Sequence, residues 1–161
     1  MQTVLRAVLP LCVLPTLLTT AFAGAAEAQS IESGEPEYHE HVVAFFVGGA
    51  REGARDDGVA VGIEYEHRQS GRFGIGVSLE HTFGDIDTWV LAIPFAYHTG
   101  AWKLYVGPGI EDGEEGSESL LRVGGEYGFE VGDWEIAPQL DVDLVDGEET
   151  WVVGVTFGKG L

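Results

Sequence analysis

The 161-residue sequence is poor in cysteine and in basic residues, and each shortage limits what the protein can be. Its one cysteine, Cys12, lies in an N-terminal segment with the pattern of a cleaved secretion signal. Neither disulfides nor thiolate metal sites are therefore expected in the mature chain. Eight Lys and Arg residues face 27 Asp and Glu residues, giving a formal net charge of −19. Because phosphate binding needs basic side chains, nucleic acid is not an expected partner.

The N-terminal segment is an expected signal peptide over residues 1–28. Arg6 is followed by a short apolar run, and small residues suited to cleavage end at positions 23 and 28. A transmembrane helix is the weaker interpretation, because two prolines interrupt the run. Cleavage after residue 23 is the alternative. Residues 29–40 are polar without a period, and we expect a mobile acidic lead-in there, followed by one domain over 41–161.

Two-faced segments of about ten residues fill this domain, and none has the period of an amphipathic helix. In FGIGVSLEHTF, residues 73–83, large apolar residues occupy nearly every odd position, while the even positions are small or polar. Such alternation predicts a β-strand with two unlike faces. Eight segments of this kind follow one another: 41–50, 58–68, 72–83, 88–98, 102–111, 119–130, 134–144 and 150–161. The first segment is apolar on both faces, so the sequence does not show which of its faces points inward.

The connections between these segments alternate in character. QSG, TGA and VGD are tight and contain glycine, as hairpin turns do, whereas REGARDD, GDID, DGEEGSE and VDGEE are longer and acidic. Short turns at one end and longer loops at the other predict an all-β, eight-stranded, antiparallel up-and-down barrel. An even strand count places both termini at the short-turn end.

The large apolar row has its aromatic residues near the strand ends and aliphatic residues in the middle. Two aromatic girdles around an aliphatic band are typical of the lipid-facing surface of a transmembrane barrel. The residues expected at the lipid interface are Tyr65, Trp89, Tyr97, Trp102, Tyr127, Trp134, Trp151 and Phe157. The alternative is a soluble, periplasmic, lipocalin-like binder of an apolar ligand, in which the same row would line the interior.

Several stretches carry a resemblance to a known group of proteins over residues 39–161: YHEH, IEYEHR, VGPGIE, LLRVGGEYGFE, WEIAPQLDVDL and VVGVTFGKGL. With these the chain resembles the small outer-membrane β-barrel proteins of Gram-negative bacteria. Its layout is similar to the membrane domains of outer membrane proteins A and X, and it is closer to short porin-like barrels. The resemblance implies an outer-membrane location, periplasmic termini, and outer-membrane lipid and the barrel-assembly machinery as partners. It departs at the last residue, Leu161, where such barrels usually end in an aromatic residue.

The inward row is rich in acids. Eight strands leave an interior that side chains nearly fill, so a wide pore is not expected. A lumen charge network is predicted at mid-depth, with Arg122 pairing one or two of the carboxylates; its members are Glu64, Glu80, Arg122, Glu126 and Asp141. Carboxylates without a partner must be hydrated, protonated or bound to a cation. The network is expected either to plug the barrel or to form a narrow path for cations.

No cofactor, metal site or catalytic residue is predicted. The acidic loops could attract cations, although their spacing is not that of a calcium-binding loop. His39 and His41, with Glu37 and Glu40, could bind a transition metal, but a polar lead-in with two histidines is more often only that. The few serines have no evident histidine and acid beside them. The expected protein is therefore non-enzymatic, with a structural or surface-interaction role or one in small-solute or cation passage.

Overall fold

A computed structural model describes residues 39–53, 56–114 and 116–161, so the predicted signal peptide, Glu37 and most of the lead-in lie outside the described residues. The strands are β1 (His41–Glu52), β2 (Asp56–Arg68), β3 (Phe73–Gly84), β4 (Thr88–Ala92), β5 (Phe95–Thr99), β6 (Trp102–Gly113), β7 (Gly116–Tyr127), β8 (Phe129–Val131), β9 (Trp134–Val145) and β10 (Glu148–Gly160). All pair antiparallel with their neighbours. Among the described residues there is no helix long and apolar enough to cross a membrane.

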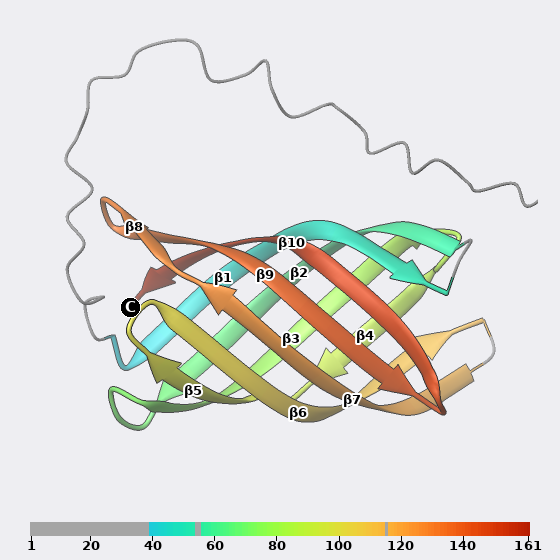
Figure 1. Cartoon of the computed structure of the whole chain (residues 1–161), viewed down its shortest axis with the longest axis horizontal. Helices are drawn as coiled ribbons and strands as arrows, with labels where there is room; N and C mark the ends of the chain where they lie inside the picture. Colours follow the sequence, from blue (N-terminus) through green and yellow to red (C-terminus); the bar gives the residue numbers. More distant parts are fainter. Residues whose placement is uncertain (1–38, 54–55, 115) are drawn as a thin grey trace, which may run out of the picture. The chain divides into compact units, whose positions relative to one another are not determined.

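These segments form eight spans around a closed barrel, which confirms the predicted fold class (Figure 1). Segments β4 and β5 are one span, because both pair with β3 on one side and β6 on the other. Pro94 separates them, since it has no N–H to give to the ladder. Segments β7 and β8 likewise share β9 as their partner. The ring closes between β1 and β10, from Val42 opposite Gly160 to Glu52 opposite Thr150.

The large apolar row points outward. Leu79, in the FGIGVSLEHTF segment, is 38% exposed, whereas its neighbour Glu80 is 3% exposed. The same contrast settles the register of β1, which the sequence left open. Phe45 is 49% exposed on the outer face, and Phe46 is 1% exposed inside the barrel. A soluble barrel would bury the apolar row, so the faces are arranged as in a membrane-embedded barrel.

The predicted contrast between short turns and longer loops is wrong. The spans that consist of one continuous strand are 12–13 residues long. These strands extend into most of the stretches that were expected to be loops. At the barrel end where longer loops were predicted, the connections are only 53–55, 85–87, 114–115 and 146–147. At the end where short turns were predicted, they are 69–72, 100–101 and 132–133. Asp146 and Gly147 both have positive φ, as a two-residue hairpin of the Asp-Gly type requires.

The acidic residues near these connections form strand instead of loop because they find cross-strand partners. Arg51 of β1 donates from Nε and Nη2 to Asp57 of β2, at 2.9 and 2.8 Å. Ser117 of β7 donates to Asp112 of β6. We call this end of the barrel the acidic end and the other, which carries the C-terminus in Figure 1, the terminal end.

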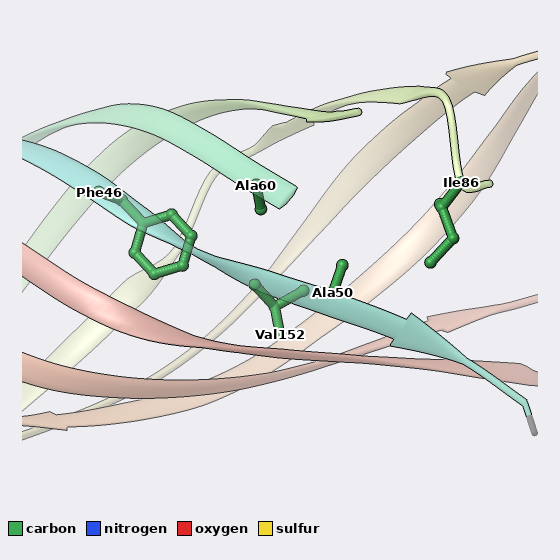
Figure 2. Close-up of a cluster of buried hydrophobic side chains, with 5 residues drawn as sticks. All are labelled: Phe46, Ala50, Ala60, Ile86 and Val152. Carbon is green, nitrogen blue, oxygen red and sulfur yellow. The ribbon is translucent and has the colours of Figure 1, made fainter. Parts of the chain in front are cut away.

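An apolar layer fills the lumen near the acidic end, where the sequence predicted a polar interior. Figure 2 shows one cluster there, made of Phe46, Ala50, Ala60, Ile86 and Val152. Ile86 belongs to the β3–β4 connection, yet its side chain turns into the barrel and is only 5% exposed. A second buried cluster joins Val90, Leu120 and Val145. Between this layer and the terminal end, the interior is polar, as expected.

Candidate functional site

An arginine at the centre of the lumen holds three carboxylates, and we call this group the arginine cluster. Arg122 donates from Nε and Nη2 to Asp143, at 2.7 and 2.6 Å. Its Nη2 also donates to Glu80 at 3.3 Å, and Nη1 lies 4.0 Å from Asp141. All four residues are at most 3% exposed. The guanidinium is therefore in a bidentate, charge-assisted pair shielded from water.

The barrel register explains this arrangement. Arg122 and Asp143 are direct partners in the β7–β9 ladder, so their inward side chains meet. Glu80 comes from β3, which is not a neighbour of either strand, and it reaches Arg122 across the lumen. The cluster thus connects opposite walls of the barrel.

A second group, which we call the lysine cluster, lies toward the terminal end. Lys103 of β6 is 2.7 Å from Glu126, its ladder partner on β7. From across the lumen, Glu66 and Glu64 of β2 approach the same ammonium at 3.3 and 3.7 Å. Glu66 also accepts a 2.5 Å hydrogen bond from Nε2 of His98. This group again joins walls that are not adjacent.

Neutral polar side chains connect the two clusters. The Tyr105 hydroxyl donates to Asp141. The Gln139 amide donates to Asp141 at 2.8 Å and to Glu64 at 3.2 Å, so it contacts both clusters. Gly124 leaves room for this layer, because a Cβ at that position would come within 2.6 Å of the Tyr105 ring. The charged interior is therefore one continuous network.

This network and the apolar layer leave little open space inside the barrel. The cavity beside the lysine cluster, lined in part by Glu64, Lys103 and Glu126, has a volume of about 20 Å³. That is room for about one water molecule. The arrangement can hold walls together and exclude solutes, and a conducting path would require side chains to move.

The mouths of the barrel are wider and differ in charge. A pocket of about 420 Å³ at the acidic end is lined by many carboxylates, namely Glu52, Asp85, Asp87, Glu111, Glu114, Glu118 and Glu148. Ile86 and Val145 of the apolar layer line the same pocket. At the terminal end a pocket of about 230 Å³ has mixed charge, with Arg68 and Lys159 beside Glu130 and Glu135.

The predicted lumen residues thus fall into two groups. Glu80, Arg122 and Asp141 belong to the arginine cluster, and Glu64 and Glu126 belong to the lysine cluster. The prediction left out Asp143, the main partner of Arg122. Counting outward along both strands from the tight turn at 132–133 puts these two residues opposite each other, so the sequence did carry that signal.

The aromatic residues predicted for the lipid interface lie on the outer face near the strand ends. Trp89, Trp102, Trp134 and Trp151 are 47–51% exposed. At the terminal end Trp102 packs edge-on against Tyr127, with ring centroids 5.0 Å apart. Tyr65, Tyr97 and Phe157 are on the same face.

Comparison with known proteins identifies the fold. Neither a protein-family model nor a curated protein matches the chain. Among solved structures, it is similar to the N-terminal β-barrel domain of Pseudomonas aeruginosa OprF, with 14% identity and a TM-score of 0.55 over 76% of this chain and 98% of that one. Neisserial surface protein A is similar with 12% identity and a TM-score of 0.53, over 75% and 96%. The chain has the eight-stranded transmembrane barrel fold of these proteins.

Proposed function

We propose that this chain is a non-enzymatic barrel of a bacterial outer membrane whose lumen is closed in its resting state. The main observation behind this proposal is that the two faces of the sheet are reversed relative to a soluble barrel. Apolar side chains cover the outside at mid-strand, while charged side chains are paired within. Burying that outer surface in lipid removes it from water. This stabilises the embedded barrel by roughly 25 cal/mol of free energy per Å² of apolar surface. The periplasmic location of both termini follows as part of the proposal.

The soluble, lipocalin-like alternative has less support. An apolar ligand needs an apolar cavity of a few hundred Å³. The lumen beside the lysine cluster instead has about 20 Å³ of space, lined largely by charged side chains. The exposed apolar exterior would also make a soluble barrel aggregate.

Membrane fractionation tests the proposal. When the full chain is expressed in a Gram-negative host, we expect it in the outer-membrane fraction. It should also migrate differently on a detergent gel before and after boiling, because the closed ladder resists detergent. Release with the periplasmic fraction and no difference in migration would contradict the membrane assignment.

The absence of enzymatic activity is supported by the surroundings of the serines. Ser70 accepts hydrogen bonds within its own turn, and Ser117 donates to Asp112. Ser78 is buried without a hydrogen-bond partner among the described residues. His81, on the outer face, packs against Phe83 and Trp89 rather than against a serine. This is not the constellation that nucleophilic catalysis requires.

A structural or surface role fits the closed lumen and the short connections. The connections leave little protein above the acidic end, so contacts there would be made through carboxylates rather than through large loops. Cations and basic molecules are the partners that such a surface attracts. The barrel-assembly machinery is the partner we propose for insertion of the barrel into the membrane.

Narrow cation passage is the second candidate, and the acidic mouth pocket favours it. A ring of carboxylates raises the local concentration of cations at the entrance. Further into the barrel from this pocket, however, the apolar layer and the arginine cluster fill the lumen. We expect the purified barrel to be electrically silent in planar bilayers. Regular cation-selective conductance steps would instead favour passage.

A further inference from the structure

A group of two histidines and a carboxylate lies at the terminal end, outside the lumen clusters. His41 of β1 is directly opposite His67 of β2, and Glu40 immediately precedes β1. One ligand atom from each side chain lies within 4.8 Å of the other two. The two histidines belong to the outward-facing row, so they are separate from the acidic mouth and from the charge network. All three side chains remain accessible to solvent, at 36–64% exposure.

Backbone pairing holds these residues together. The Arg68 N–H donates to the Glu40 carbonyl at 2.8 Å, so the β1–β2 ladder continues past the start of β1. Because Glu40 and Arg68 are joined in this way, the next pair, His41 and His67, is of the non-hydrogen-bonded type, in which side chains lie closer. Their rings stack with centroids 5.0 Å apart.

Neighbouring groups also orient the imidazole nitrogens. Nδ1 of His41 is 2.8 Å from the Tyr65 hydroxyl, which leaves Nε2 toward Glu40 Oε1 at 3.9 Å. Nδ1 of His67 is buried and has no hydrogen-bond partner among the described residues; Glu40 Oε1 lies 4.0 Å from it. A buried imidazole nitrogen without a hydrogen bond, aimed at a carboxylate beside a second imidazole, is suited to bind an ion.

We propose that Glu40, His41 and His67 form a binding site for a divalent transition-metal ion, with Zn²⁺ as the best match. Two imidazoles and one carboxylate are a common ligand set for zinc, and imidazole disfavours Ca²⁺ and Mg²⁺. Ligand atoms around a tetrahedral zinc ion are about 3.3 Å apart, so side-chain rotations that bring these atoms closer by up to about 1.5 Å complete the site. A fourth position remains for water or for a partner's ligand.

The bound ion would fasten the start of β1 to β2, with Tyr65 as a positioning residue that fixes the His41 ring. His39 is not part of this group. Its ring lies against Gly160 and lines the terminal mouth pocket. The sequence suggested His39 and His41 as a pair of metal ligands. Strand pairing instead places His67, and not His39, beside His41.

Calorimetry with ZnCl₂ tests the site. The full chain is expressed, and the barrel is isolated from membranes in detergent, stripped of metal with a chelator, and titrated in excess Ca²⁺ to occupy the acidic end. We expect one Zn²⁺ per barrel. His41→Ala and His67→Ala should each weaken binding by about tenfold or more. His39→Ala is the matched control and should bind as the unaltered chain does.

The proposal is overturned if the unaltered barrel does not bind Zn²⁺, if His67→Ala binds equally well, or if His39→Ala loses binding to the same extent. The boiled and unboiled gel comparison shows whether each variant is folded. Should the alanine variants fail to fold, Co²⁺ added to the unaltered barrel provides the answer. A four-coordinate Co²⁺ spectrum that Zn²⁺ abolishes supports the site, and a six-coordinate spectrum unaffected by Zn²⁺ contradicts it.

Discussion

Replacing Arg122 with alanine should destabilise the barrel by about 3–5 kcal/mol, the usual cost of removing one partner from a buried ion pair. The Arg122 side chain is 2% exposed, and its loss leaves Glu80, Asp141 and Asp143 without their shared cation. Those carboxylates lie where water cannot replace the lost hydrogen bonds. The free energy of unfolding can be measured by urea titration in lipid vesicles, using tryptophan fluorescence.

Arg51→Ala is the matched control. Arg51 also pairs with an aspartate, Asp57, at 2.8 Å, but both side chains are at least 60% exposed. We expect a loss of at most about 1 kcal/mol, as for other surface ion pairs. Similar losses at Arg51 and Arg122 would show that the arginine cluster is no more important than a surface pair.

Neutralising the partners separates charge from packing. In a triple variant with Arg122→Ala, Glu80→Gln and Asp143→Asn, most of the charge left unpaired by Arg122→Ala is removed, while the lost arginine volume is the same. We expect this variant to be more stable than Arg122→Ala. If it is equally unstable, then the lost volume of the arginine, and not the uncompensated carboxylates, accounts for the effect.

The outward row was predictable because it depends only on local alternation. A strand has period two, so one row of Phe73, Ile75, Val77 and Leu79 sufficed to define the face, and the closed barrel carries that row outside. Contacts between non-adjacent strands were not predictable in this way. Glu80 meets Arg122 only because the barrel closes, and closure and stagger are properties of the whole sheet.

One buried side chain was missed, and several acidic stretches were assigned to loops although they are largely strand. The stretch GDID was interpreted as a loop, and residues 85–87 do connect β3 to β4, but nothing in the sequence indicated that Ile86 within it is buried in the lumen as part of an apolar layer. The acidic stretches around Arg51 and Ser117 were also interpreted as loops. Side-chain pairs across the hairpins allow them to continue as strands. In these acidic stretches, tertiary contacts outweigh the local preference.

An arginine placed on the outer face at mid-strand should destabilise the barrel by about 2–4 kcal/mol in a lipid bilayer, and much less near a strand end. Ile63 and Val59 make a matched pair for this comparison. Both lie on β2, both face outward, and both are 58% exposed. Ile63 is opposite Phe45 and Leu79 near the middle of their strands, whereas Val59 is opposite Phe83 near the acidic end.

The two environments proposed for the outer face give different results for this pair. In lipid, Ile63→Arg carries its charge into the hydrocarbon, so we expect a loss of about 2–4 kcal/mol, against about 0–1 kcal/mol for Val59→Arg. In water, equal exposure would give both variants nearly equal stability, because each guanidinium would be equally hydrated. Urea titration in vesicles measures the difference directly. Equal losses at the two positions would mean that depth has no effect, and the outer face would then not be in contact with the membrane interior.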